Sequence, residues 1–467
     1  MPKKEKKIKI KKTEVKKNIK EKTGAKEKEV LTVEKGKRTY NLLRGMHDIL
    51  PKDEKYLKPM YHNAEELASH FQFGRIETPV LEEMGLFVRS IGKGTDVVDK
   101  EMYVFEDKDG TKVCMRPELT APAVRAFIMH GMWNMPQPVK LWYWGSMFRH
   151  DRPQAGRYRE FHQVGFETFG SSDPSTDAEL ILIAYNFYKD IGLPVEIHIN
   201  SLGTPEERAN YKAELVNYYR SKRSYLCEEC RNRLTKNPLR LLDCKEERCK
   251  GVKDEAPQII NWLGADSKNH FMKVLEYLDA LEIPYQLDHT LVRGLNYYTK
   301  TVFEVYASET EIGSQSALGG GGRYDLLVEE MGGRPTPAAG MALGIERSVL
   351  ALKQYNEKNN KEMTRIPVGA FIAQLGEEAR QVTLKLINEM RTSGIKIAFN
   401  FFKTSLKNQL ELADNLKVPY AVIIGQKEYQ DGTAIIRDME SGIQEIVDQK
   451  KLISILKRKL GIFDEKK

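Results

Sequence analysis

The chain has 467 residues, of which 41% are hydrophobic, and this length predicts two or three domains with cores of their own. No apolar run reaches the ~18–20 residues that a membrane-spanning helix needs, and no apolar stretch follows the charged N-terminus, so the sequence predicts a soluble protein without a signal peptide. The net charge of +8 comes from the N-terminus, because residues 1–39 carry a net +10 and the rest of the chain about −2.

The basic N-terminal segment, residues 1–39, contains 15 Lys and one Arg against six Glu and is predicted to be a disordered extension. It is either a solvated extension without a dedicated role or a weak arm that attracts nucleic acid through its charge. A mitochondrial presequence is not expected, since such segments are rich in Arg and Ser and poor in acidic residues.

The first ordered segment is predicted to begin with a helix. Apolar residues recur at helical spacing over residues 54–71, and the preceding Asp48 and Pro51 favour a capped helix entry. A strand broken by Pro79 is expected over residues 73–81. Further strands are predicted over residues 113–115, 139–144 and 157–169. In the last of these, polar residues alternate, which is typical of a sheet floor that faces a ligand.

The composition changes between residues 202 and 269, where the chain becomes highly charged and helical. We therefore expect a helical domain inserted into a main domain that spans residues 40–355. Strand-like sequence returns at residues 299–306, and a helix is expected over residues 344–353. The glycine run at residues 319–322 is either a flexible loop or a close approach of the backbone to a ligand.

A polar stretch at residues 356–365 is predicted to link the main domain to a second one, residues 366–467. In this second domain strands and helices alternate, as in a small α/β domain. Strands are expected over residues 368–373, 395–399 and 420–424, with helices between them. The pair Asp431-Gly432 favours a tight turn between two further strands.

The sequence has no Walker A loop, no GxGxxG after a strand and no HExxH. ATP chemistry would therefore depend on arginines set among β-strands. Residues 148–167 fit that description, because four arginines fall within eleven residues around a loop that contains Pro and Gly: Arg149, Arg152, Arg157 and Arg159. Guanidinium groups bind phosphates bidentately and stay charged when desolvated.

These and other ordered motifs resemble the class II aminoacyl-tRNA synthetases and, in detail, the histidyl-tRNA synthetase family. Residues 148–167 resemble motif 2 in its histidine-specific form, and residues 291–298 (Leu-Val-Arg-Gly-Leu-Asn-Tyr-Tyr) resemble a signature of the histidine enzymes. Residues 116–122 resemble the family's histidine-binding strand, and residues 321–325 resemble a second signature. Residues 340–347 resemble motif 3, and residues 73–79 resemble motif 1. The match runs from about residue 40 to 460 in the family's order.

This resemblance implies an α+β fold, in which a class II antiparallel sheet flanked by helices carries a helical inserted domain and is followed by a C-terminal α/β anticodon-binding domain. It implies a cytoplasmic homodimer without membrane attachment. Such an enzyme activates L-histidine with ATP to histidyl-adenylate, releases pyrophosphate, and transfers histidine to the 3′ end of histidine tRNA. The inserted domain would hold the acceptor arm.

The resemblance also implies an ATP site. Arg149 and Arg293 would hold the α-phosphate from two sides and stabilise the charge that develops there. Arg157 and Arg347 would clamp the γ-phosphate end of a bent ATP, with Mg²⁺ bridging phosphate oxygens. Phe161 and Arg347 would sandwich the adenine.

A histidine site is implied in the same way, and Arg293 would border it as well. The residues expected to meet the ammonium group are Glu118, Thr120 and Gln163. Those expected to meet or enclose the imidazole are Glu167, Tyr298, Tyr297 and Tyr324. Taken alone, Glu118 and Glu167 are more typical of sheet-edge carboxylates, and Tyr297 and Tyr298 are more typical of core aromatics, than of a binding site. A pocket that bonds both ring nitrogens rejects analogues that lack them.

Two positions depart from the family's pattern. Asn296 stands where the family usually has Asp, which keeps the size but loses a charge near Arg293. Lys93 stands where an acidic residue is common. Neither departure removes a group to which the resemblance gives a catalytic role. We nevertheless expect Asn296 to affect the rate of the reaction.

Four of the five cysteines lie close together in the sequence. Cys227 and Cys230 are separated by two residues, and after thirteen more residues come Cys244 and then Cys249. This spacing favours a structural Zn²⁺ site, with unligated reduced thiols as a second interpretation and a redox role as a third. The pattern is not that of a secreted disulfide framework, which favours a reducing cytoplasm.

Two related functions are alternatives to the synthetase. A regulatory paralogue that partners ATP phosphoribosyltransferase resembles the catalytic core but usually lacks the signature at residues 291–298 and the C-terminal domain. A tRNA-sensing module of a stress kinase has eroded motif arginines and an adjoining kinase domain. Arg149, Arg293 and Arg347 are all present here, and no kinase signature exists, so both alternatives are disfavoured.

Overall fold

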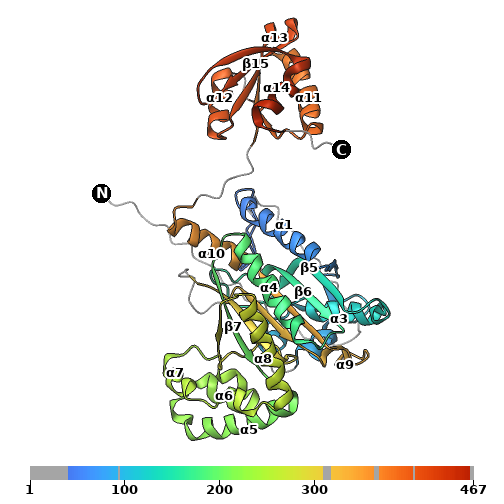
Figure 1. The fold of residues 1–467 in the computed structure, drawn as a ribbon, viewed down its shortest axis with the longest axis vertical. Coiled ribbons are helices and arrows are strands. Elements are labelled where there is room, and N and C mark those ends of the chain that lie inside the picture. Colours follow the sequence, from blue (N-terminus) through green and yellow to red (C-terminus); the bar gives the residue numbers. More distant parts are fainter. Residues whose placement is uncertain (1–39, 93–94, 309–316, 362–367, 403–404, 463–467) are drawn as a thin grey trace, which may run out of the picture. The chain divides into compact units, whose positions relative to one another are not determined.

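An eight-stranded sheet organises the chain before residue 361 (Figure 1). The computed structural model describes residues 40–92, 95–308, 317–361, 368–402 and 405–462, so that the predicted extension at residues 1–39 lies outside the described residues. The strands, in their order across the sheet, are β1 (Gly74–Arg75), β5 (Val139–Phe148), β6 (Glu160–Phe169), β11 (Ala338–Gly344), β10 (Gly319–Arg323), β9 (Thr299–Ala307), β7 (Val195–Ser201) and β8 (Tyr285–Leu287). Neighbours are antiparallel except at the two edges, where β1 runs parallel to β5 and β8 to β7.

Strand β6 shows how the sequence builds this sheet. Its side chains alternate between the two faces. Val164 and Phe166 are buried in the core on one face, whereas Phe161 and Gln163 line a cavity on the other. The predicted alternation of polar residues is therefore confirmed, although the strand begins three residues later than expected, at Glu160.

Four helices cover the apolar face: α1 (Glu54–His70), α4 (Pro174–Asp190), α8 (Ala265–Ala280) and α10 (Ile345–Lys358). The predicted helix at residues 54–71 is confirmed, but its expected entry is wrong, since Asp53 occupies the N-cap position and Asp48 lies outside the helix. Asp53 instead accepts a hydrogen bond of 2.7 Å from Lys353 of α10. Helix α10 runs to Lys358, three residues into the predicted linker.

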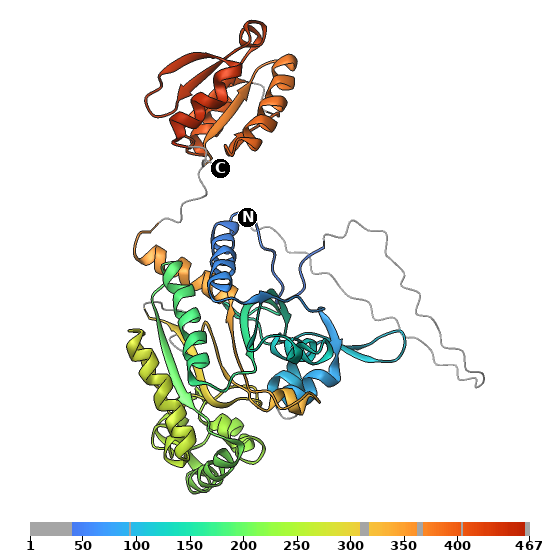
Figure 2. The ribbon, with the colours of Figure 1, turned by 45° about the vertical axis from the view of Figure 1, so that its right-hand side comes forward.

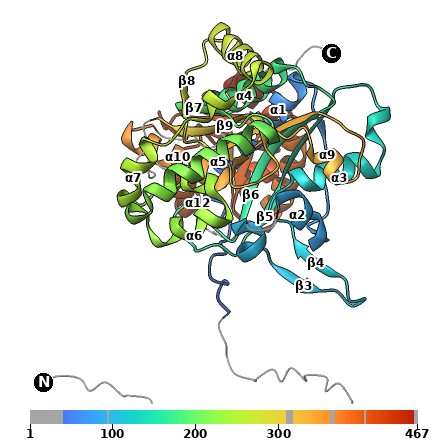
Figure 3. The same cartoon turned by 90° about the horizontal axis from the view of Figure 1, so that it is seen from below.

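A smaller three-stranded sheet lies beside the large one and consists of β2 (Leu81–Glu83), β4 (Lys112–Met115) and β3 (Val104–Glu106). Figure 3 shows its β3–β4 hairpin extending away from the main sheet. The expected strand over residues 73–81 is split between β1 and β2, because Pro79 has no N–H with which to continue a ladder. Helix α2 (Met84–Ile91) packs on this sheet. The other short helices of this region are η1 (Val97–Glu101), α3 (Thr120–Met129), η2 (Met132–Asn134) and α9 (Leu327–Glu330).

Every named element between β7 and α8 is helical (Figure 2). These elements are α5 (Pro205–Ser221), η3 (Arg223–Tyr225), α6 (Glu228–Lys236), η4 (Pro238–Leu241), α7 (Glu247–Asp254) and η5 (Ile259–Trp262). Helix α5 starts with a capping box, in which Thr204 and Glu207 satisfy each other's backbone N–H groups.

The C-terminal region, taken by itself, has a five-stranded sheet in the order β13 (Ile397–Phe399), β12 (Ala370–Gln374), β14 (Tyr420–Ile424), β15 (Thr433–Asp438) and β16 (Gln444–Asp448). Its helices are α11 (Glu377–Thr392), α12 (Leu406–Asn415), α13 (Gln426–Asp431) and α14 (Gln449–Leu460). The predicted strand turn at Asp431-Gly432 is wrong. Gly432 ends α13 in the left-handed conformation (φ 64°), and the hairpin between β15 and β16 turns at residues 439–443.

No helix in the described part of the chain combines the length and the apolar composition that crossing a membrane requires.

Candidate active site

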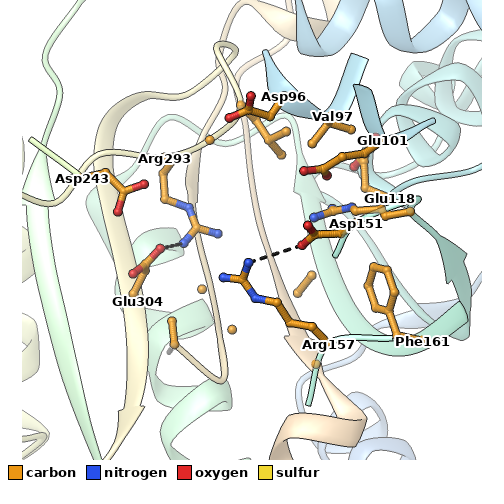
Figure 4. A pocket seen from close by; sticks show the side chains of 18 of the residues that line it. Asp96, Val97, Glu101, Glu118, Asp151, Arg157, Phe161, Asp243, Arg293 and Glu304 are labelled. Carbon is orange, nitrogen blue, oxygen red and sulfur yellow. Dashed lines mark hydrogen bonds and ion pairs between the residues drawn. The ribbon is translucent and has the colours of Figure 1, made fainter. Parts of the chain in front are cut away.

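A cavity of about 1100 Å³ opens on the polar face of the large sheet (Figure 4). Ten of the twelve residues predicted for the ATP and histidine sites line it: Glu118, Thr120, Arg149, Arg157, Phe161, Gln163, Arg293, Tyr297, Tyr298 and Arg347. Glu167 and Tyr324 are not part of the lining. They lie directly behind it, because Glu167 bonds to Thr120 and to Tyr143, both of which do line the cavity.

Arg149 is held at the end of β5. Its Nε donates to the Pro117 carbonyl at 2.9 Å, and its guanidinium carbon lies 5.4 Å from the centre of the Phe161 ring. These contacts leave its terminal nitrogens for a ligand in the cavity. Burial raises the pKa of the nearby Glu101 carboxyl, although the charge of Arg149 opposes that rise.

Arg157 and Arg347 meet through a tight loop. Gly156 has φ 72°, and a β-carbon there would lie 3.2 Å from Cγ of Arg347. Its carbonyl accepts from Nε of Arg347 at 3.3 Å, while Arg157 pairs with Asp151 at 3.3 Å. Burial, together with the like charges of Arg157 and Arg149, lowers the pKa of Arg347 to about 10. The three guanidinium groups therefore create a positive field that a polyphosphate would neutralise.

Glu346 ties this region to the sheet. Its two carboxylate oxygens accept from the backbone N–H of His162 and contact that residue's ring Nδ1, both at 2.8 Å. This contact with Glu346 raises the pKa of His162. Residue 346 opens α10 and residue 162 lies on β6, so this pair fixes the motif 3 helix against the motif 2 strand.

Arg293 is a further cation of the cavity, and its guanidinium bonds to Glu304 of β9. Glu304 also accepts from the Tyr306 hydroxyl at 2.6 Å. Burial opposes the charged form of Arg293, but the Glu304 carboxylate together with the Tyr298 and Tyr297 hydroxyl groups outweighs it, so the pKa of Arg293 is raised. Arg293 also lies over the Tyr298 ring, 5.5 Å from its centre. It is therefore charged and oriented without a substrate.

Glu118 bonds to the first turn of helix α3. Its carboxylate oxygens accept from the backbone N–H groups of Thr120 at 2.7 Å and Ala121 at 2.9 Å. Burial raises the pKa of Glu118, while these two N–H donors counter that rise. On β6, Oε1 of Gln163 is buried and has no hydrogen-bond partner among the described residues. An unpaired buried acceptor beside a carboxylate suits a cationic ligand.

Glu167 is fully buried and accepts from three hydroxyl groups, those of Thr120 at 2.7 Å, Tyr143 at 3.0 Å, and Tyr324. Burial raises its pKa to about 8, and the three hydroxyl donors only partly counter this. A β-carbon at Gly340 would lie 1.6 Å from Oε2 of Glu167, so no other residue type fits at position 340.

The glycine run forms strand β10 rather than a flexible loop. A β-carbon at Gly321 would lie 2.2 Å from the Gly340 carbonyl, and one at Gly320 would lie 2.3 Å from the Phe303 carbonyl. The neighbouring strands thus leave no room for side chains in this part of the sheet. At Gly320 the same β-carbon would also lie 2.9 Å from Arg293, which brings the cavity wall close to the backbone.

Several lining residues were not predicted from the sequence. Glu304 lies on a predicted strand, where side-chain alternation could have placed it on the same face as its partner Tyr306, which lies outside the lining. The pairing of Asp96 with Arg240 at 3.4 Å and with Arg233 at 3.9 Å had no such signal, since more than a hundred residues separate the partners. These pairs join the inserted helices to the segment after α2.

The four cysteines come together in the inserted segment. Their sulfur atoms lie within 4.8 Å of one another, and they are the one group among the described residues with a metal-binding arrangement. The Cys227 sulfur accepts from the backbone N–H of Cys230 at 3.4 Å, and the Cys249 sulfur accepts from that of Cys227 at 3.2 Å. Cys244 also lines the large cavity.

Two positions were predicted to depart from the family's pattern. Asn296 is exposed, and Lys93 lies outside the described residues.

Comparisons with known proteins agree with this geometry. Residues 45–347 match the family model described as histidyl-tRNA synthetase, and residues 369–459 match the anticodon binding domain. The chain is 43% identical over 425 residues to a histidine–tRNA ligase from Dehalococcoides mccartyi, an alignment that covers 90% of the chain and 100% of that relative. A histidine–tRNA ligase from Aquifex aeolicus is 44% identical over 411 residues, with 88% and 99% covered. The crystal structure of apo histidyl-tRNA synthetase from S. aureus superimposes with a TM-score of 0.74 at 33% identity, covering 90% of this chain and 100% of that one.

Proposed function

The chain belongs to the histidyl-tRNA synthetase family, and from that premise we propose how its residues carry out the reaction. The protein is an ATP-dependent histidine–tRNA ligase whose substrates are histidine, ATP and histidine tRNA. The observation that carries the proposal is the convergence of Arg149, Arg157, Arg293 and Arg347 with Glu118 on one cavity. Groups that bind phosphates thus stand beside a group that binds an ammonium ion.

In the first step a carboxylate oxygen of histidine attacks the α-phosphorus of ATP. The bond from that phosphorus to the bridging oxygen breaks, and pyrophosphate leaves with the electron pair. Negative charge builds on the α-phosphate oxygens, where Arg149 and Arg293 stabilise it from two sides. Because Glu304 already orients Arg293, little reorganisation is needed when the charge develops.

In the second step a ribose hydroxyl at the 3′ end of the tRNA attacks the carbonyl carbon of histidyl-adenylate. An ester bond forms, the bond from that carbon to the phosphate oxygen breaks, and AMP leaves. The hydroxyl proton passes to solvent or to the leaving phosphate. The same arginines hold the phosphate group in both steps.

The ATP molecule would lie along the arginine side of the cavity. Arg157 and Arg347 clamp the γ-phosphate, and Phe161 and Arg347 enclose the adenine. Bound Mg²⁺ would neutralise part of the phosphate charge. Glu101 fits as its protein ligand, since this half-buried carboxyl lines the same cavity and has a raised pKa that a cation would lower again.

Histidine would lie on the carboxylate side. Glu118, Thr120 and the unpaired Oε1 of Gln163 accept from its ammonium group. Glu167 and Tyr298 bond to the imidazole, with Tyr297 and Tyr324 closing the pocket. Since Glu167 already accepts from three hydroxyl groups, the ring N–H would replace one of them.

We propose that the cysteine cluster holds a structural Zn²⁺. Tetrahedral zinc with bonds of about 2.3 Å to sulfur places the sulfur atoms about 3.8 Å apart, and Sγ of Cys227 lies 3.9 Å from Sγ of Cys244. The backbone N–H groups that donate to Cys227 and Cys249 would stabilise thiolates.

We further propose a domain organisation. Residues 40–355 form the catalytic domain, residues 202–269 within it hold the acceptor arm, and residues 366–467 bind the anticodon. Two protomers form a cytoplasmic homodimer through the region of motif 1 and the small sheet. Exposed apolar side chains there support this surface: Leu81 is 49% exposed, Val104 44% and Phe105 45%.

The experiment that tests the proposal is amino-acid-dependent ATP–pyrophosphate exchange on the purified full-length chain. Exchange should occur with histidine alone and should fall about 100-fold or more in Arg293→Ala, because one side of the α-phosphate clamp is lost. Arg391→Ala, an exposed arginine of α11, serves as the matched control. A folded wild-type protein that shows no exchange with any amino acid would overturn the proposal in favour of a regulatory paralogue.

A further inference from the structure

A second cavity, of about 330 Å³, shares a wall with the active site. Arg240, Arg293 and Leu295 line both cavities. The side chains that line the second cavity include five cations and no carboxylate: Arg208, Lys212, Lys236, Arg240 and Arg293. A cavity with this lining attracts anions.

The cations come from separate elements that the fold brings together. Arg208 and Lys212 are four residues apart on α5 and therefore lie on one face of that helix. Lys236 ends α6, and Arg240 lies in η4. A β-carbon at Gly294 would lie 3.2 Å from Nη1 of Arg240, so this glycine lets Arg240 pack closely against the signature segment.

Most of this charge lacks a counter-ion. Arg240 pairs with Asp96 and Arg293 with Glu304, but Arg208, Lys212 and Lys236 have no ion pair within 4.0 Å among the residues that the structure describes. The Arg208 guanidinium donates to the Tyr298 carbonyl, and burial lowers its pKa, which Glu330 outside the cavity only partly offsets. A half-buried guanidinium without a carboxylate is stabilised by a bound anion.

Arg240 adds a second sign of an absent partner. Its Nε is buried and has no hydrogen-bond acceptor in the described part of the chain. Buried guanidinium N–H groups are normally satisfied, and an orphan one points to an acceptor that binds there.

Asn296 contributes an uncharged side chain to this cavity. It lies on the cavity wall, and its amide lies against Gly92, whose β-carbon would be 2.9 Å from Nδ2. An aspartate there would place a negative charge among the cations. The amide leaves them free to bind an external anion.

A phosphate group is the anion that these residues fit, since lysine and arginine donors arranged without a carboxylate bind phosphate oxygens. Either a free phosphate or a phosphodiester has this chemistry. The reaction itself supplies the second source, because the 3′ end of the tRNA must reach the active site, and Arg240 and Arg293 border both cavities. We propose that the second cavity binds a backbone phosphate of the tRNA next to its 3′ end. This inference rests on the proposed tRNA-charging function.

The test compares the Lys212→Glu/Lys236→Glu double variant with Lys250→Glu. All three lysines are exposed on inserted helices, and Lys250 lines neither cavity. In steady-state aminoacylation the double variant should raise the KM for tRNA about tenfold. In tRNA binding measured at several salt concentrations, the magnitude of the slope of log affinity against log salt concentration should fall by about one. Histidine-dependent ATP–pyrophosphate exchange should stay within about twofold of wild type, because neither lysine contacts the first cavity.

Asn296→Asp gives an isosteric second test. It should also raise the KM for tRNA, since it places a carboxylate in the cavity, and the effect should be larger at low salt. If instead the double variant changes the dependence of exchange on pyrophosphate and leaves the KM for tRNA unchanged, the cavity serves a free phosphate and the proposal is overturned. Unchanged values in both assays also overturn it. If the wild-type protein itself shows no histidine-dependent ATP–pyrophosphate exchange, the proposed function is refuted instead.

Discussion

The contact between Glu304 and Arg293 shows how one carboxylate prepares the active site. Glu304 holds a guanidinium that is proposed to meet the α-phosphate. We predict that Glu304→Gln lowers kcat for ATP–pyrophosphate exchange about tenfold and leaves the KM for histidine nearly unchanged, because the loss is one of orientation rather than of histidine binding.

The controls for this prediction are Glu440→Gln, an exposed carboxylate of the C-terminal region, and a double-variant cycle with Arg293→Ala. If Glu304 acts through Arg293, its substitution adds little in the Arg293→Ala background. An additive loss would contradict the positioning role and would favour a direct contact of Glu304 with substrate or Mg²⁺.

Glu167 makes stability depend on pH. Burial raises its pKa from 4.5 to about 8. Between pH 4.5 and about pH 8 the native state keeps a proton that the unfolded state releases. The contribution of Glu167 to the free energy of unfolding therefore falls as the pH rises through this range, and it no longer changes above it. We predict that the Tm of Glu167→Gln, measured by scanning fluorimetry, rises relative to the Tm of the wild type as the pH increases from about 5 to about 8.

The comparison of the two proteins cancels the titration of groups that they share. A Tm difference that stays constant across this pH range would show that Glu167 is ionised in the native protein. The same variant should lower kcat/KM for histidine about 100-fold, since the proposed acceptor of the ring N–H becomes an amide.

At the scale of elements, the alternation of side chains explains most of what could be predicted. On β6 a period of two places ligand-facing and core-facing residues correctly from the sequence. The helix entry at Asp48 and the turn at Gly432 were wrong because Asp and Gly serve caps, turns and helix ends alike. Which of these roles applies depends on what packs nearby, such as Lys353 on Asp53.

The cysteine cluster carries a prediction about the inserted helices. Purified protein should contain about one zinc per chain, and Cys230→Ser should lose it, since a tetrahedral site needs all four sulfurs. Because Cys244 lines the active-site cavity and Arg240 bonds nearby to Asp96, loss of metal should raise the KM for tRNA more than it slows histidine-dependent exchange.

Cys114→Ser is the matched control for this experiment, since Cys114 is the buried cysteine outside the cluster. That variant should keep its metal, as measured by elemental analysis. Metal-free wild-type protein with full tRNA charging would support the reduced-thiol interpretation instead.

At the scale of the whole molecule, the proposed homodimer makes its own prediction. Sedimentation should give twice the mass of the chain. Phe105→Glu should shift the equilibrium toward monomer, because it places a charge among exposed apolar side chains at the proposed interface. Tyr429→Glu, an exposed aromatic of the C-terminal region, is the control. A monomeric wild type with full activity would contradict the dimer.

The sequence by itself determined the family, the α+β class and ten lining residues of the cavity, because ordered motifs and strand alternation are local properties of the chain. Only the tertiary structure decided that Glu167 and Tyr324 lie behind the lining, that Glu304 holds Arg293, and that two basic helices face Asn296 across a second cavity. These features depend on contacts between residues far apart in the chain. Burial and the partners present there, rather than residue type, set the charge and orientation of each group.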